Sequence, residues 1–198
     1  MRVIGITGGV GAGKSRILAI LRERYHADII QADEVAKALE EPGQEGLRLL
    51  AEEFGSGILD ESGRLDRERF ASLIFQDEEA LKKVNAIIHP LTWTEICRQV
   101  SESNAPLVAV EAALFDENSR GLCGELWYID TSEENRIARL MENRGYTRQK
   151  CLDIMANQAD RQAFLKLADV VIDNNGSVDD VQSQIAAALG SAAEDDFD

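Results

Sequence analysis

The chain has 198 residues, 44% of them hydrophobic and 29% charged, which suits one sizeable α/β core and excludes two ordinary enzyme domains. A formal net charge of −15 argues against a nucleic-acid partner, and three cysteines without a C-x-x-C pair argue against a zinc site or a disulfide framework. No basic leader precedes the first strand, and no apolar run approaches the roughly 18 residues of a membrane span. We therefore expect a cytoplasmic protein with no membrane partner.

The chain opens with a strand and a glycine-rich loop. Val3–Thr7 is apolar and β-branched, and the eight residues Gly8–Ser15 then fill the pattern G-x-x-x-x-G-K-S/T. In such a P-loop, backbone N–H groups surround a phosphate, the lysine reaches the β- and γ-phosphates, and the hydroxyl ligates Mg²⁺. We predict a nucleoside triphosphate site with Ser15 as a metal ligand. Its binding residues are Gly8, Gly9, Val10, Gly11, Ala12, Gly13, Lys14, Ser15 and Arg16.

Further apolar runs follow, and most are separated by helical patterns. This alternation predicts an α/β fold, a P-loop NTPase-type parallel sheet flanked by helices, with ligands at the carboxyl ends of the strands. The runs are Asp28–Ile30, Leu107–Val110, Leu126–Ile129 and Val170–Ile172.

Residues 34–105 carry helix signals and no strand pattern. Asp66 and Asp77 are typical helix N-caps, and Pro90 suits a first helical position. We expect a helical insertion that holds a second substrate, between two core segments at about 1–33 and 106–189. Residues 190–198 are an acidic tail to which we assign no function.

Basic residues gather between Arg136 and Lys166, seven against three acidic residues in an otherwise acidic chain. Such a run is often only a solvated helical face. Beside a P-loop it favours a lid over residues 143–166, in which Arg139 and Arg144 stabilise the charge of phosphoryl transfer and Gly145 supplies the hinge. Thr131 with Glu134 matches a capping box before one helix, and Gly145 can end that helix. Ser177 with Asp180 matches a capping box before the last helix.

Two carboxylates follow strands at the edge of the sheet where the P-loop opens. Asp33 comes just after the second strand, where it can accept the proton of an acceptor hydroxyl or simply cap the helix that follows. Glu111 ends the third strand and can hold Mg²⁺ through water. The sequence thus predicts a general base and a metal-binding carboxylate.

Together these features resemble the dephospho-coenzyme A kinase family, from about Arg2 to Leu189. The residues that carry the resemblance are Ile4–Ser15, Ala32-Asp33, Ile88–Leu91, Ala113–Glu117, Arg139–Arg144, Gln158 and Ala168–Gly176.

The resemblance implies a P-loop core, a helical CoA-binding part and a lid. It also implies transfer of the γ-phosphate of ATP to the ribose 3′-hydroxyl of dephospho-CoA, the last step of coenzyme A synthesis. By the same resemblance, Asp33 is the base and His89 lies near the acceptor. Leu114 and Glu117 belong to the substrate site, and Asn174, Asn175 and Gly176 lie near the adenine.

Two other functions fit some of these residues. A kinase for a nucleoside or a nucleoside monophosphate would use the same P-loop, Asp33 and lid arginines. A GTPase switch would normally carry an Asn-Lys-x-Asp motif, which this chain lacks. The sequence sets no oligomeric state.

Overall fold

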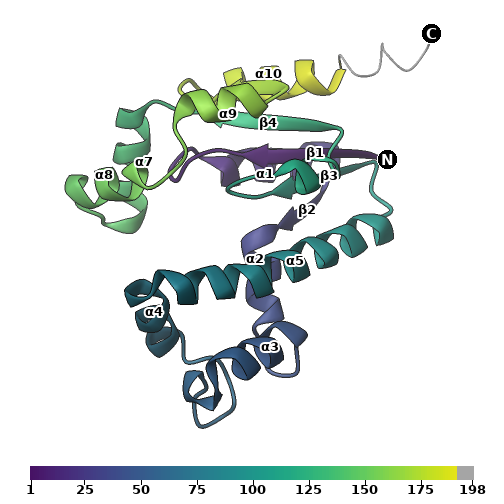
Figure 1. The fold of residues 1–198 in the computed structure, drawn as a ribbon. Coiled ribbons are helices and arrows are strands. Elements are labelled where there is room, and N and C mark those ends of the chain that lie inside the picture. Colours follow the sequence, from purple (N-terminus) through teal and green to yellow (C-terminus); the bar gives the residue numbers. More distant parts are fainter. Residues whose placement is uncertain (191–198) are drawn as a thin grey trace. The chain divides into compact units, whose positions relative to one another are not determined.

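The computed structural model describes residues 1–190, except the side chains of Gln76, Glu117 and Asn118. The chain forms two compact units (Figure 1). One comprises Met1–Ile29 and the chain from Asn104 onward, and the other comprises Ile30–Ser103. The expected acidic tail lies outside the described residues, apart from Gly190.

A parallel sheet forms the centre of the first unit. Its strands are β1 (Arg2–Thr7), β2 (Asp28–Gln31), β3 (Leu107–Glu111), β4 (Glu125–Asp130) and β5 (Val170–Asp173), in the order β2-β3-β1-β4-β5. The strand β1 pairs with β3 and β4, and Ile6 lies opposite both Glu111 and Trp127. The connection after β1 runs to β2 at one edge, whereas the connection after the neighbouring β3 runs to β4 on the other side of β1, and such a topological switch is where ligands bind in these folds. The α/β fold predicted from the sequence is confirmed.

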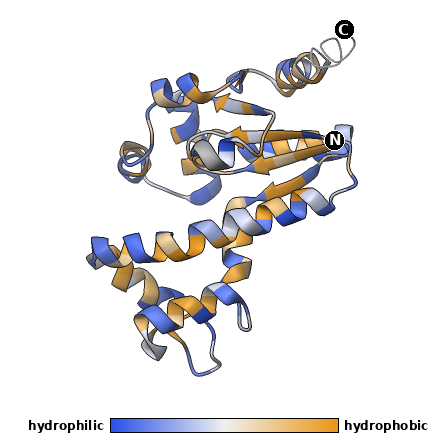
Figure 2. Ribbon diagram, turned by 45° about the vertical axis from the view of Figure 1, so that its right-hand side comes forward, coloured by the Kyte–Doolittle hydropathy of each residue, from blue (hydrophilic) through white to orange (hydrophobic). Residues whose placement is uncertain are grey.

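Helices α1 (Lys14–Tyr25) and α10 (Val178–Gly190) pack their apolar sides on one face of this sheet. The strands themselves are largely hydrophobic, as expected for a buried parallel sheet (Figure 2). The core on this face contains Ile4, Ile6, Ile17, Leu21, Trp127, Ile129, Ile172, Val181 and Ile185.

The residues of β4 that point the other way contact a different set of helices. The ring of Tyr128 stacks on Phe164 of α9 (Arg161–Leu167), with 5.0 Å between ring centroids. Helix α7 (Glu133–Arg144) packs on α8 (Arg148–Ala156) through Leu140 and Cys151, and the short α6 spans Glu117–Arg120.

The second unit is helical. It contains α2 (Ala32–Leu39), α3 (Glu45–Phe54), the 3₁₀ turn η1 (Ser56–Ile58), α4 (Arg67–Gln76) and α5 (Glu78–Glu102). The apolar sides of these helices form a core of their own that includes Leu47, Leu50, Ile58, Phe70, Val84 and Ile88.

Several local predictions for this unit can be compared with the structure. Asp66 and Asp77 cap α4 and α5 with their side chains, as predicted. Pro90 was predicted at a helix start, but it lies inside α5. Proline has no N–H to donate within a helix, and the apolar residues Val84, Ile88 and Ile96, buried along α5, hold the helix continuous despite this loss. Among the described residues, no helix is long and apolar enough to span a membrane.

Candidate active site

The P-loop joins β1 to α1, and its glycines adopt conformations that other residues rarely adopt. Gly11 and Gly13 have φ values of 75° and 88°. A Cβ at Gly13 would overlap the side-chain amide of Asn174, and a Cβ at Gly11 would lie 2.9 Å from the carbonyl oxygen of Arg136. Both positions therefore require glycine, because the backbone is left-handed and neighbouring segments approach it closely.

Several N–H groups of this loop are free to bind an anion. The N–H groups of Gly11, Gly13, Lys14 and Ser15 have no hydrogen-bond partner in the described part of the chain. Lys14 and Ser15 also form the first turn of α1, where the helix dipole places partial positive charge. This set of donors fits a phosphate group.

Lys14 and Glu111 form an ion pair at the carboxyl edge of the sheet. The Nζ atom of Lys14 donates to the carbonyl oxygen of Gly8 at 2.7 Å and lies 3.4 Å from Oε1 of Glu111. The two side chains are only 19% and 11% exposed. The described residues contain no group of three His, Cys, Asp or Glu side chains that could hold a metal by themselves.

The carbonyl oxygen of Ala12 ties the P-loop to three other segments. It accepts hydrogen bonds from Thr131 Oγ1 at 2.9 Å, Arg139 Nη1 at 3.1 Å and Asn174 Nδ2 at 2.7 Å. The predicted cap at Thr131 is wrong, because Ser132 caps α7 instead. The Thr131 hydroxyl is thereby available to hold the loop.

Arg139 also bridges α7 and the end of β5. Its Nη2 atom donates to the carbonyl oxygen of Asn174 at 2.7 Å. Burial, with a smaller repulsion from Arg16, lowers the pKa of the guanidinium from its ordinary value, and arginine keeps its charge in proteins. Arg139 therefore places a half-buried positive charge beside the P-loop.

Residues 174–176 form the turn between β5 and α10. The side chain of Asn174 is fully buried, and its Oδ1 atom has no partner in the structure. Asn175 accepts hydrogen bonds from the backbone of Ser132 at 2.8 Å and from Asn135 at 2.9 Å. Gly176 precedes the capping box of Ser177 and Asp180, which is confirmed.

Two residues that we had not assigned to the site also contact the P-loop. Arg136 Nε donates to the carbonyl oxygen of Val10 at 2.8 Å, and the N–H of Val10 donates to Gln158 Oε1 at 3.0 Å. Arg136 Nη2 donates to the same oxygen of Gln158 at 2.8 Å, which closes the ring. A signal for Arg136 was present, because it lies three residues before Arg139 and thus on the same side of one helix.

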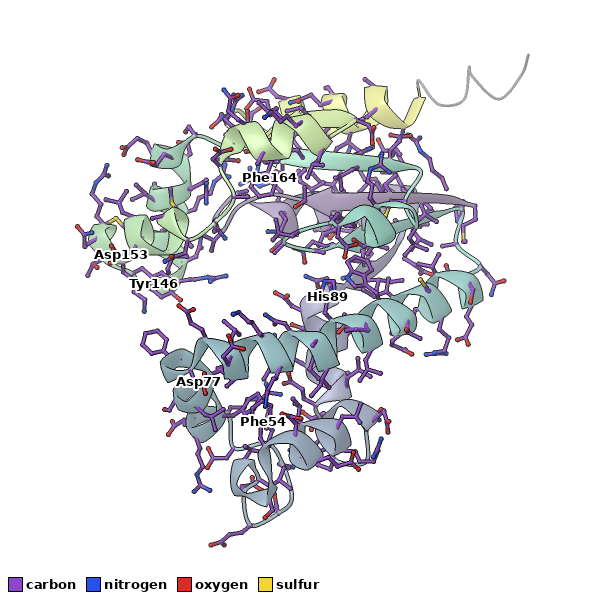
Figure 3. The ribbon with its side chains drawn as sticks, viewed as in Figure 1. Phe54, Asp77, His89, Tyr146, Asp153 and Phe164 are labelled. Atoms are coloured by element: carbon purple, nitrogen blue, oxygen red, sulfur yellow. The ribbon has the colours of Figure 1, made fainter. Side chains whose placement is uncertain are left out.

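A cavity of about 780 Å³ borders this ring of hydrogen bonds. Arg136 and Gln158 line it together with Tyr128, with Phe164 (labelled in Figure 3) and with Met155 of α8. The walls thus include both polar groups and aromatic rings.

The other predicted lid residues lie apart from the P-loop contacts. Gly145 ends α7 with φ 64°, as predicted, and its N–H donates to the carbonyl oxygen of Met141. The guanidinium of Arg144 lies 6.0 Å from the centre of the Tyr146 ring (labelled in Figure 3), its one partner among the described residues. The structure therefore brings Arg139, but not Arg144, to the P-loop.

Three of the remaining candidates are exposed or lie in the second unit. Leu114 belongs to the first unit, and its side chain is 61% exposed. The side chain of Glu117 lies outside the described part of the structure. Asp33 is in the first turn of α2, so its predicted capping role is wrong, because Gln31 occupies the N-cap position. His89 is exposed on α5, and its Nε2 atom accepts a hydrogen bond from Trp93 at 3.0 Å (Figure 3).

Comparison with known proteins decides the family. A model of the dephospho-CoA kinase family matches residues 2–180. The chain belongs to the dephospho-CoA kinase family. One relative is the dephospho-CoA kinase of Carboxydothermus hydrogenoformans, 35% identical over 94% of this chain and 92% of that protein.

Solved structures share the fold. The Thermus thermophilus protein TT1252 shares 31% identity and a TM-score of 0.79, over 96% of this chain and 97% of that one. Dephospho-CoA kinase from Campylobacter jejuni, at 22% identity, shares the fold with a TM-score of 0.69 over the full length of both chains. The resemblance to the dephospho-CoA kinase family stated from the sequence is thus confirmed.

Proposed function

We propose that this chain transfers the γ-phosphate of ATP to the ribose 3′-hydroxyl of dephospho-CoA, the last step of coenzyme A synthesis, in the cytoplasm. The observation that carries the proposal is the P-loop with unpartnered N–H groups and Lys14 at its edge, in a chain of the dephospho-CoA kinase family. Phosphoryl transfer needs positioning and positive charge more than covalent chemistry from the protein. The loop supplies both.

On the nucleotide side, the P-loop would hold the phosphates and Asn174–Gly176 would lie against the adenine. Mg²⁺ fits this site because such ions keep several waters and take only one or two protein ligands beside the phosphates. Those ligands would be the hydroxyl of Ser15 and, through water, Glu111. When bound, the ion neutralises charge on the phosphate oxygens.

On the acceptor side, Asp33 would take the proton of the 3′-hydroxyl. His89, Leu114 and Glu117 would contact dephospho-CoA, and the helical unit, about residues 34–105, would hold its CoA-like part. Residues 143–166 would act as a lid, with Arg139 and Arg144 meeting the charge of the transferring phosphoryl group.

The test is an ADP-release assay with Mg²⁺ and ATP across dephospho-CoA, adenosine and common nucleoside monophosphates, with an arm that lacks any acceptor. We expect turnover with dephospho-CoA and with none of the other acceptors, and almost no ATP hydrolysis when no acceptor is present. Lys14→Met serves as the inactive control. Equal turnover with a nucleoside monophosphate, or ATP hydrolysis that needs no acceptor, would overturn the proposal.

A further inference from the structure

The peptide groups on both sides of Val10 are fixed by side chains from outside the P-loop. The Gly9–Val10 peptide donates its N–H to Gln158, and its carbonyl oxygen accepts from the N–H of Ala12 at 3.1 Å. The Val10–Gly11 peptide is held at its carbonyl oxygen by Arg136 Nε. Neither peptide plane can rotate without losing one of these bonds.

This arrangement sets the direction of the next donor. In a planar trans peptide, the C=O of one residue and the N–H of the next point in opposite directions. Arg136 draws the carbonyl of Val10 toward α7, so the N–H of Gly11 points away from α7. That N–H is one of the loop donors without a partner among the described residues.

Arg136, like Arg139, differs from two nearby arginines in what it binds. Arg148 pairs with the carboxylate of Glu134, and Arg161 pairs with that of Asp130. Arg136 is half-buried and its described hydrogen bonds go only to neutral oxygens, so burial lowers its pKa from the ordinary value. The charge is bonded to no carboxylate, and the attraction of Glu133 only partly offsets the cost of burial, so its position against the carbonyl oxygen of Val10 points to a role at the loop.

We propose that Arg136 and Gln158 are positioning residues for phosphoryl transfer, which hold Val10 so that the N–H of Gly11 is aimed at the phosphate chain of ATP. This inference rests on the proposed function, since it takes ATP as the occupant of the P-loop. Neither residue need touch the reacting atoms. Their effect passes through the orientation of the loop.

The chief alternative is that the two side chains only join α7 and the end of α8 to the loop as structural contacts. Gln158 lines the 780 Å³ cavity, so an apolar side chain of similar size can be accommodated there. A Gln158→Leu variant is therefore expected to fold, and its kinetics separate the two roles.

The test measures steady-state kinetics, ATP affinity by calorimetry without acceptor, and thermal unfolding. We expect Arg136→Met and Gln158→Leu each to lower kcat about tenfold and to weaken ATP binding about threefold, because a donor that meets developing charge counts for more in the transition state. The KM for dephospho-CoA should change by less than about twofold, since the loop faces the nucleotide. The double variant should lose less than the product of the single losses, because both side chains act on Val10.

Two matched variants sharpen the result. Gln158→Glu keeps an oxygen that accepts from Val10 and Arg136, so it should retain at least about fivefold more turnover than Gln158→Leu, while its charge raises the KM for ATP. Ser183→Ala removes an exposed hydroxyl of α10 that bonds the carbonyl oxygen of Asp179, and it should behave as the wild type.

Each outcome decides the proposal. Wild-type kcat and ATP affinity in both Arg136→Met and Gln158→Leu would overturn it. It would also be overturned if kcat fell only in proportion to the drop in melting temperature and fell just as far in Gln158→Glu as in Gln158→Leu. Weakened ATP binding in a protein that phosphorylates no dephospho-CoA would support the positioning role and refute the proposed acceptor instead.

Discussion

Replacing Lys14 by Met should lower both turnover and the free energy of unfolding, and the two effects have different causes. The Nζ atom of Lys14 lies 3.4 Å from a Glu111 oxygen, which corresponds to about 5 kcal/mol of attraction at an effective dielectric constant of about 20. The two side chains are 19% and 11% exposed. Lys14→Met should therefore lower the free energy of unfolding by about 3 kcal/mol, the lower end of the range for breaking a buried ion pair.

The double variant Lys14→Met/Glu111→Gln separates fold from chemistry. In Lys14→Met the buried Glu111 carboxylate has lost its cation. The added Glu111→Gln change removes that unpaired charge, so the double variant should regain about 2 of the 3 kcal/mol of unfolding free energy. Turnover should not return, because removing a charge that stabilises the transferring phosphoryl group lowers kcat by about 10² to 10³. Urea unfolding measures the first quantity, and coupled ADP release measures the second.

Two results would refute this reasoning. Unchanged kcat in Lys14→Met would mean that the P-loop lysine does not serve the reaction. Stability equal to the wild type in Lys14→Met, or lower stability in the double variant than in the single one, would mean that the ion pair with Glu111 contributes nothing to the fold.

Three further predictions concern the other proposed roles. Asp33→Asn keeps the size of the side chain and should lower kcat by a factor of about 10² to 10⁴ without changing the unfolding transition. Normal turnover would show that Asp33 is not the general base. Arg139→Ala and Arg144→Ala should each lower kcat at least about tenfold, more than they raise KM, and trypsin cleavage after Arg144 should slow when ATP, Mg²⁺ and dephospho-CoA are present; wild-type turnover with ligand-independent cleavage would make residues 143–166 a solvated helical face. Ser15→Ala should raise the Mg²⁺ concentration needed for half-maximal rate about tenfold or more, and an unchanged requirement would exclude its hydroxyl as a ligand.

The sequence was sufficient for features set by local patterns. The P-loop and the five strands follow from spacing and from apolar runs. Each predicted strand lies within the observed one, which extends one residue further at one or both ends. The caps at Asp66, Asp77 and Gly145 follow from residue type and position. These signals are local, and the tertiary contacts at these positions are compatible with them.

The errors and omissions have a common physical origin in long-range contacts. Thr131 matched a capping box, but its hydroxyl is used by Ala12, 119 residues away in the sequence. The contacts of Arg136 and Gln158 with Val10 span 126 and 148 residues, which no helical or strand period reveals. Pro90 was a local signal that the packing of α5 overrode. The P-loop itself was therefore predictable, whereas the contacts by which distant side chains hold it were not.

The measurement that tests the central claim most directly is the identity of the product. Dephospho-CoA, ATP and Mg²⁺ are incubated with the protein, and the product is examined by mass spectrometry and phosphorus NMR beside a matched reaction with the 3′-deoxy analogue of dephospho-CoA. We predict one added phosphoryl group as a 3′-monoester, and no phosphorylation of the analogue. Phosphorylation of the 3′-deoxy analogue, or a product phosphorylated at any other position, would contradict the account.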